Sequence, residues 1–324
     1  MSLRITRTGL LDTVQDGGRM GYQHLGIGPG GPMDRFSARL ANALLGKPLD
    51  SPVIELHFPA ATLLFEKPAI ICLCGADFMP CINGEPVPMH HPIVVNSQAV
   101  LSFEKKLQGT RVYLALLAPL VLESWLGSYS TSIIAGTSGW LKKDDSLYWE
   151  EISLPAKCLQ QKFTVLPWKT NDTVDWRNEV EFIMGSEWHW LSPAAKEQFQ
   201  HGFFQLTKDS DRMGFRMAGQ KLETGPEIET LVSSAVSFGT VQLLPDGQLI
   251  VLMADHQTTG GYPRIAHVIS AHLPILAQKG PSDIVQFRMT SLEAAEQKLL
   301  KQQKYLEQLQ IACKFRIENL LHEA

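Results

Sequence analysis

Six short apolar runs between residues 53 and 118 set the fold class: Val53-Ile54-Glu55-Leu56, Ala61-Thr62-Leu63-Leu64-Phe65, Ala69-Ile70-Ile71-Cys72-Leu73, Pro92-Ile93-Val94-Val95, Val100-Leu101-Ser102-Phe103 and residues 111–116. Turn-forming residues separate the runs, and Ile82-Asn83-Gly84-Glu85 carries the Asn-Gly pair that favours a tight hairpin. Because short strands at this spacing are typical of a barrel or a sandwich, we predict a mainly β protein.

A second set of predicted strands begins at Val180-Glu181-Phe182-Ile183. Between the two sets, residues 127–150 are rich in Gly, Ser and Thr and predict a loop, and residues 155–178 predict a connector. After a helical stretch near 192–200, the later predicted strands are 203–207, 239–243, 248–254, 265–269 and 283–288. Thr240-Val241-Gln242 echoes Thr13-Val14-Gln15, which is compatible with two similar barrels.

Two further stretches predict helices. In residues 34–46, apolar side chains recur at helical spacing, with Asp34 as the N-cap and Gly46 as the C-terminal stop. Near the end of the chain, Thr290-Ser291-Leu292-Glu293 has the pattern of a capping box, and an apolar stripe continues through residues 291–324. This long helix either packs on the chain's own barrel or forms an interface with a partner or a second copy.

The composition excludes several classes of function. A net charge of -4 provides no basic face for nucleic acid or an anionic membrane. No stretch of about 18 uncharged apolar residues could span a membrane, and the N-terminal residues lack the pattern of a signal peptide. The five cysteines lack the spacing of a metal site, so we expect buried free thiols, no metal and a cytoplasmic location.

The first candidate site is the glycine-rich stretch from Thr13 to Asp34, which includes Asp16 and Arg19. Paired glycines let backbone N–H groups approach an anion, and the Arg19 guanidinium could hold a carboxylate or phosphate through two hydrogen bonds. The stretch is not a phosphate-binding P-loop, because no Gly-Lys-Ser/Thr closes it. The alternative is a structural turn in which Asp16 and Arg19 satisfy each other.

Two more clusters lie in the second half of the chain. Ser210-Asp211-Arg212-Met213-Gly214-Phe215-Arg216 predicts a loop whose adjacent Asp and Arg either form an internal ion pair or bind a polar substrate. Residues 255–264 follow a buried strand and offer a potential base in Asp255 or His256, together with amide and hydroxyl groups, two glycines and an aromatic ring. A polar turn of this kind after a buried strand is a common place for a site.

Taken together, these stretches resemble the signatures of the allophanate hydrolase subunit 2 family, which is biotin-dependent carboxyltransferase-like. The resemblance covers residues 3 to 296 and rests on Gly9 to Arg19, Gly30 to Asp34, Ala41 to Gly46, Ser210 to Gly214, Gln257 to Pro263 and Ser291 to Ala295. The family includes half of the carboxyltransferase domain of urea carboxylase, the C-type subunit of bacterial 5-oxoprolinase and the KipA-like antagonists of a sporulation kinase inhibitor. The sequence departs from the family pattern at His256, Ser233-Ser234-Ala235-Val236, Leu117-Ala118 and Gly139-Trp140.

The resemblance implies two cyclophilin-like β-barrel domains, at 1–170 and 171–290, with short helices and a long C-terminal helix at 291–324. It implies a partner of the subunit 1 type, equivalent to the B-type subunit of 5-oxoprolinase and KipI-like, and a LamB/YcsF-type protein, the A-type subunit, as a further candidate. A chain without carrier modules looks more like the C-type subunit of 5-oxoprolinase, an enzyme that opens a lactam with ATP to give glutamate, ADP and phosphate. The alternatives are carboxyl transfer from carboxybiotin on another protein, and a regulatory protein that sequesters its subunit 1 partner.

The same resemblance suggests the site residues. ATP would bind in the complex, and no biotin is expected on this chain because it lacks an Ala-Met-Lys-Met motif. Arg19 and Arg212 would hold anions, and Asp211 and Asp255 would orient polar groups or act as bases. Electrostatic stabilisation of a developing oxyanion would be the main catalytic effect. The expected catalytic residues are Asp211, Arg212 and Asp255, and the expected substrate-binding residues are Asp16, Arg19, Asp34, Gln257, Thr258, Gly260, Gly261 and Tyr262.

Overall fold

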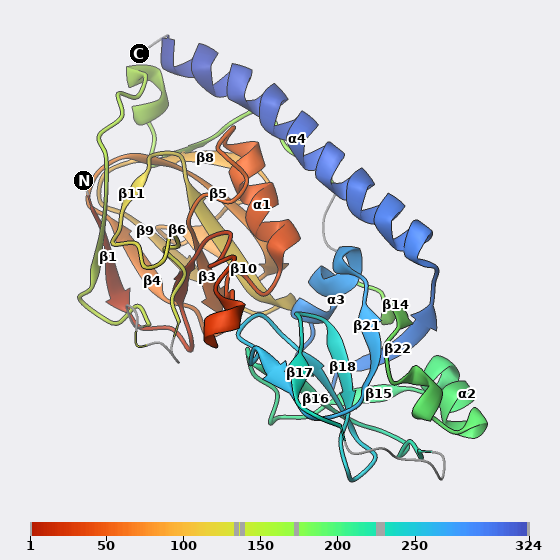
Figure 1. The fold of residues 1–324 in the computed structure, drawn as a ribbon. Coiled ribbons are helices and arrows are strands. Elements are labelled where there is room, and N and C mark those ends of the chain that lie inside the picture. Colours follow the sequence, from red (N-terminus) through yellow and green to blue (C-terminus); the bar gives the residue numbers. More distant parts are fainter. Residues whose placement is uncertain (1, 133–135, 137–139, 172–174, 225–230, 323–324) are drawn as a thin grey trace. The chain divides into compact units, whose positions relative to one another are not determined.

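The computed structural model describes residues 2–132, 136, 140–171, 175–224 and 231–322. They form two compact units, shown in Figure 1. Unit 1 combines residues 1–18, 34–174 and 303–324, and unit 2 combines residues 19–33 and 175–302. Each unit is therefore assembled from separate stretches of the chain.

The strands of unit 1 form two sheets around one hydrophobic core, which includes Ile5, Phe65, Leu73 and Leu114. The first sheet has the order β11-β12-β1-β4-β9-β6-β7 and the second β13-β8-β5-β10-β3-β2. Their bounds are β1 Ser2–Arg7, β2 Thr13–Gln15, β3 Val53–His57, β4 Thr62–Phe65, β5 Ala69–Asp77, β6 Pro80–Ile82, β7 Glu85–Pro86, β8 Pro92–Val95, β9 Ala99–Phe103, β10 Gln108–Leu116, β11 Leu120–Val121, β12 Ser146–Trp149 and β13 Phe163–Val165.

All six predicted strands between residues 53 and 118 are confirmed, and so is the hairpin at Asn83-Gly84, which joins β6 to β7. The prediction of a loop over 127–150 is wrong at its end, where β12 pairs with β1. Likewise, the predicted connector at 155–178 contains β13, which pairs with β8. Both strands are only three or four residues long, so their pattern is too short to stand out from polar neighbours.

The predicted first helix is confirmed as α1, Arg35–Leu44, which packs on β5 and β10. The Asp34 side chain caps it by accepting a hydrogen bond of 2.8 Å from the Ser37 N–H. After α1, Gly46 has a φ of +66°, and a Cβ on it would lie 2.5 Å from the Cα of Lys314. Only glycine provides both this backbone conformation and this close approach.

Unit 2 contains a closed barrel with the strand order β14-β21-β18-β19-β16-β15-β22. Its core includes Phe182, Phe199 and Phe287, and the rings of Phe199 and Phe287 stack with centroids 4.7 Å apart. The bounds in unit 2 are β14 Glu179–Met184, α2 Pro193–His201, β15 Phe204–Leu206, β16 Gly214–Ala218, β17 Ser234–Ala235, β18 Thr240–Leu243, β19 Leu249–Leu252, β20 Thr259–Gly260, β21 Arg264–Val268, α3 Leu273–Ala277 and β22 Ile284–Met289. Short 3-10 turns occur in both units, at η1 Gln23–Leu25, η2 Ala156–Leu159, η3 Trp188–Trp190 and η4 Ser270–His272.

The mainly β fold with short helices is confirmed, and the later predicted strands correspond to β14, β15, β18, β19, β21 and β22. The prediction of a loop over residues 210–216 is wrong in its second half, because Gly214 begins β16. A two-stranded ribbon, formed by β17 and β20, lies outside the barrel's strand order. The predicted domain limits at 170 and 290 stay a prediction.

The long helix α4 runs over Leu292–His322, and residues 323 and 324 of the predicted helix lie outside the described part. Its cap is Ser291, whose hydroxyl accepts from the Ala294 N–H at 3.2 Å. The predicted capping box is therefore wrong, because the third residue after the Ser291 cap is Ala294 and not a glutamate. The Thr290 N–H donates to the Phe182 carbonyl instead. Its buried side chains are Leu306, Cys313 and Ile317, which all belong to unit 1. None of the described helices has the length and apolar run of a membrane span.

Candidate functional site

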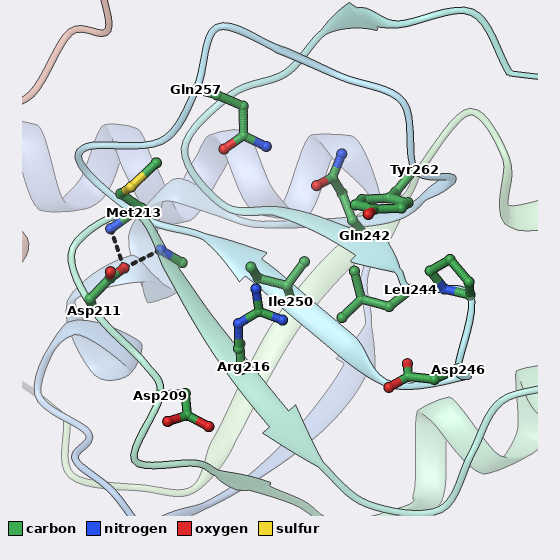
Figure 2. Close-up of a pocket in the computed structure, with 12 residues that line it drawn as sticks. Asp209, Asp211, Met213, Arg216, Gln242, Leu244, Asp246, Ile250, Gln257 and Tyr262 are labelled. Atoms are coloured by element: carbon green, nitrogen blue, oxygen red, sulfur yellow. Dashed lines mark hydrogen bonds between the residues drawn. The ribbon is translucent and has the colours of Figure 1, made fainter. Parts of the chain in front are cut away.

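Unit 2 holds an open pocket of about 430 Å³, a size that suits a small molecule. Figure 2 shows the side chains around it. Its lining combines apolar side chains, two amides, one guanidinium and three carboxylates. The lining residues are Asp209, Asp211, Met213, Gly214, Arg216, Gln242, Leu244, Pro245, Asp246, Ile250, Gln257 and Tyr262.

The most deeply buried polar group of this pocket is the amide of Gln242. On β18, Val241 and Leu243 belong to the barrel core, so Gln242 projects from the opposite face of the strand. Its side chain is only 1% exposed. Neither its Oε1 nor its Nε2 has a hydrogen-bond partner among the described residues. Such atoms are normally paired when buried.

The ribbon of β17 and β20 lies against this amide. Ser234 pairs with Gly260 and Ala235 with Thr259. A Cβ at position 260 would lie 2.4 Å from Nε2 of Gln242, so glycine leaves the space that the amide occupies. Figure 2 shows the Gln242 amide between the side chains of Gln257 and Tyr262.

A charged pair anchors the ribbon to the barrel. The Arg264 guanidinium donates to both oxygens of Glu187, at 3.0 and 2.7 Å, and also to the Ala235 carbonyl at 3.3 Å. Burial raises the pKa of the Glu187 carboxyl, but the hydrogen bonds and charge of Arg264 outweigh it, so the net pKa is lowered. The ion pair thus stays charged at neutral pH.

Arg212 and Asp255 meet directly, although 43 residues separate them in the sequence. Arg212 donates to both carboxylate oxygens, at 2.7 and 3.1 Å, and to the Gly31 carbonyl at 2.7 Å. The backbone repeats the link, since the Asp255 N–H donates to the Arg212 carbonyl. The pair therefore ties the loops at 31, 212 and 255 together, and the alternative of an ion pair between adjacent Asp211 and Arg212 is wrong.

Arg19 lies close to the same cluster and is 1% exposed. A Cβ on Gly30 would be 3.5 Å from its Nη1 and 3.7 Å from Oδ1 of Asp255, which places both charged groups around Gly30. Asp211 has a different role, because its carboxylate accepts from the N–H groups of Met213 and Gly214 and shapes the turn into β16. Asp211 also lines the pocket.

Asp16 and Asp34 belong to unit 1, and protein donors already occupy their oxygens. Asp16 accepts from the hydroxyls of Ser128 and Ser130 and from the Tyr129 N–H. Asp34 caps α1, and its N–H donates to the Tyr113 hydroxyl at 2.7 Å. Their predicted role in binding a substrate stays a prediction.

Three of the predicted site residues line the pocket, namely Asp211, Gln257 and Tyr262. Gly260 lies against Gln242, and the carbonyl of Thr258 accepts from the Val236 N–H within the ribbon. Gly261 is close to the Ser233 hydroxyl. Sequence reasoning missed Gln242, Asp209 and Asp246, and it included Arg216 in a candidate cluster without giving it a role. For Gln242 a signal existed, because it lies in the Thr-Val-Gln echo.

The positions that depart from the family pattern are divided between the two units. His256 is buried, and its Nδ1 is within hydrogen-bond distance of the Gln257 carbonyl. Ser234 is in the ribbon, whereas Leu117, whose N–H donates to the Ile70 carbonyl, and the exposed Trp140 are in unit 1. Gly139 lies outside the described residues.

The sequence matches one protein family and several known proteins. Residues 25–289 match the family described as carboxyltransferase domain, subdomain A and B. The C subunit of 5-oxoprolinase from Escherichia coli (strain K12) is 33% identical over 314 residues, which cover 95% of this chain and 97% of that protein. The C subunit of 5-oxoprolinase from Haemophilus influenzae is 33% identical over 301 residues, covering 92% and 94%.

Solved structures give a similar result for the fold. The crystal structure of the Kluyveromyces lactis urea carboxylase superposes with a TM-score of 0.82 at 26% identity. The match covers 95% of this chain but only 29% of that chain. This chain therefore corresponds to one part of that larger protein.

Proposed function

This chain belongs to the carboxyltransferase-domain family of subdomains A and B, and from that membership we propose that it is the C-type subunit of an ATP-dependent 5-oxoprolinase-like amidohydrolase. The reaction opens the ring of 5-oxoproline with water and ATP and gives glutamate, ADP and phosphate. The chain acts with a B-type partner, and a LamB/YcsF-type protein, the A-type subunit, completes the complex.

One observation carries this proposal. The chain corresponds to 97% of the C subunit of a bacterial 5-oxoprolinase, at 33% identity, but to only 29% of the urea carboxylase structure. It thus corresponds to nearly the whole of one subunit of the first enzyme and to one module of the second. The five cysteines are all buried free thiols, which supports a reducing cytoplasm as its location.

The pocket in unit 2 is the proposed substrate site. Tyr262, Ile250 and Leu244 offer apolar surface for a small ring, and Gln257 offers an amide. The Arg212–Asp255 pair holds the loops that carry Gln257 and Asp211, so it acts as a positioning pair. Fixed dipoles of this kind lower a reaction barrier because they need no reorganisation when charge develops on the carbonyl oxygen.

ATP fits this pocket poorly. Asp209, Asp211 and Asp246 contribute three negative charges to the lining, and Arg216 contributes one positive charge. The single guanidinium can pair with one carboxylate, but it cannot offset the several charges of a triphosphate, which the three aspartates would repel. We therefore propose that ATP binds elsewhere in the complex, and we assign no step of its chemistry to this pocket.

The test is co-expression of this chain with its A-type and B-type partners, followed by product analysis. We expect the purified complex to form glutamate and ADP in equal amounts when 5-oxoproline is added, and this chain alone to form neither. A complex that assembles but shows no dependence of ADP formation on 5-oxoproline would contradict the proposal.

A second function is favoured by the family itself, since its description is that of a carboxyltransferase domain. In that case the chain would transfer a carboxyl group from carboxybiotin on a separate carrier protein to urea. The same complex can be supplied with urea, a biotinylated carrier and a biotin carboxylase. Urea-dependent consumption of carboxybiotin, without any turnover of 5-oxoproline, would favour this second function.

A further inference from the structure

We propose that Gln242 recognises a cis-amide, such as the ring amide of a lactam, through both polar atoms of its side chain. The inference rests on the proposed function only for the identity of the natural ligand, 5-oxoproline. The recognition itself follows from the burial of Gln242, its hydrogen bonding and the chemistry of the pocket.

Gln242 has no hydrogen-bond partner for either amide atom among the described residues. It is 1% exposed, faces away from the barrel core and lines the pocket. A buried amide that is left unpaired is costly, and a methionine of similar size would avoid that cost. A ligand that pairs with the amide explains why it is there.

Unit 1 contains the same Thr-Val-Gln sequence, at Thr13 to Gln15. There, Nε2 of Gln15 donates to the Thr13 hydroxyl at 3.0 Å. In unit 2, the equivalent Thr240 hydroxyl accepts from the Ser237 N–H at 3.1 Å and lies 3.2 Å from Nδ1 of His267. Thr240 is thus engaged elsewhere, and neither amide atom of Gln242 has a hydrogen-bond partner among the described residues.

The shape of a side-chain amide determines which ligand group can pair with both of its polar atoms. In a primary amide, the oxygen acceptor and one N–H donor lie along the same edge. A cis-amide presents its N–H and C=O along one edge in the same way, so the two can form a pair of parallel hydrogen bonds. Ordinary secondary amides are almost always trans and present these groups on opposite sides. A five-membered lactam ring enforces the cis form.

The rest of the lining complements such a ligand. Ile250, Leu244 and the ring of Tyr262 can cover the methylene groups of a small ring. Arg216 is exposed at the pocket and forms no ion pair with any described residue, so its guanidinium can take a ligand carboxylate through two hydrogen bonds. A lactam that carries a carboxylate thus has one group that suits Gln242 and another that suits Arg216.

The test measures binding of small lactams to the full-length chain by ligand-observed and side-chain amide NMR. The probes are 2-pyrrolidinone and N-methyl-2-pyrrolidinone, which has no N–H to donate. We expect the unmethylated lactam to bind about tenfold more tightly, because methylation leaves Oε1 of Gln242 unpaired. Its binding should shift the side-chain amide resonances of Gln242.

The decisive variant is Gln242→Met, with Gln205→Met on the exposed face of β15 as the matched control. We expect Gln242→Met to lose the preference for the unmethylated lactam while its melting temperature stays equal or rises. Gly260→Ala should also weaken lactam binding, because its Cβ displaces the Gln242 amide. Gln205→Met should bind both lactams as the natural chain does.

Each outcome decides the inference. Equal binding of the two lactams by the natural chain, or no binding at the highest soluble concentration, would overturn it. A folded Gln242→Met variant that keeps the preference would also overturn it. So would a Gln242→Met variant with a lower melting temperature, because Gln242 would then have a structural role. If the complex turns over 5-oxoproline without this preference, the inference fails and the proposed function stands. If the preference depends on Gln242 but the complex does not turn over 5-oxoproline, the inference about Gln242 stands and the proposed function fails.

Discussion

At the scale of single residues, His90 shows how burial changes a side chain's response to pH. It precedes β8 with a φ of +60°, and its N–H donates to the Leu73 carbonyl at 2.8 Å. Burial lowers the pKa of its imidazole to about 4, with a further contribution from His91, while Asp77 acts in the opposite direction. The folded state therefore favours the neutral ring.

This shift predicts a loss of stability in acid. The folded pKa lies below the unfolded value of 6.5, so the contribution is complete above pH 6.5 and is lost as the pH falls toward 4. We expect His90→Asn, which tolerates a positive φ, to remove at most about 3 kcal/mol of this pH dependence of the free energy of unfolding. Urea denaturation between pH 7 and pH 4 measures it.

The control is His24→Asn, which changes an exposed histidine. It should leave the pH dependence as it is in the natural chain. If His90→Asn and the natural chain lose stability in parallel over this range, His90 is not the group that titrates.

At the scale of elements, the end of α1 and the C-terminal half of α4 meet at one glycine in unit 1. Gly46 adopts a φ of +66°, and its missing Cβ leaves room for the backbone of Lys314. The Trp168 indole adds a nearby contact, since its N–H donates to the Leu44 carbonyl and the Arg316 guanidinium lies 5.8 Å from its ring centroid. Position 46 thus sets how closely α4 can pack.

Gly46→Ala should therefore destabilise the protein in two ways, through backbone strain and through a clash with Lys314. The same substitution at Gly84 measures the backbone strain alone. Gly84 has a φ of +79°, but a Cβ there would meet nothing within 4 Å. We expect Gly84→Ala to lower the free energy of unfolding by about 1 kcal/mol through backbone strain alone. Gly46→Ala should lose at least about 2 kcal/mol more, because Lys314 must shift. Equal losses in thermal or urea unfolding would show that the close approach to α4 contributes nothing.

The ribbon of β17 and β20 is a second element whose position depends on one contact. Glu187→Gln removes the negative charge that pairs with Arg264 and leaves the partly buried Arg264 guanidinium without an anionic partner in this pair. We expect a loss of about 3 kcal/mol from the free energy of unfolding at neutral pH. Because the pKa of Glu187 is lowered on folding, this loss should shrink as the pH falls below about 4.5.

An exposed ion pair in the same barrel gives the matched comparison for that measurement. Glu179 accepts from Arg288 at 2.8 Å with both side chains well exposed. Glu179→Gln should cost less than about 1 kcal/mol, because water screens the pair. Similar losses for the two variants would mean that the Glu187–Arg264 pair does not anchor the ribbon.

At the scale of the whole molecule, the sequence predicted the strands and helices better than the contacts between them. The apolar runs at 69–73 and 249–254 identified β5 and β19, because a buried strand has a clear local pattern. The short strands β12 and β16 were missed because they begin in polar or glycine-containing stretches. Local pattern is therefore enough for strands that lie in a continuous apolar run.

The candidate site was predicted in part, for a related reason. The motifs at 210–216 and 255–264 are visible in the sequence, and the resemblance linked them. The pairing of Arg212 with Asp255 could not be predicted, because it depends on which barrel strands become neighbours. Gln242 was not predicted because an amide in an apolar strand resembles a core residue until its lack of partners among the described residues is seen.

The most direct test of the whole account is ATP hydrolysis by the reconstituted complex, with and without this chain. We predict that 5-oxoproline stimulates ADP formation only when this chain is present, and that the rate saturates as the chain is titrated against a fixed amount of its partners. Stimulation by 5-oxoproline that is the same without this chain would contradict the account, and so would turnover that requires urea and carboxybiotin instead.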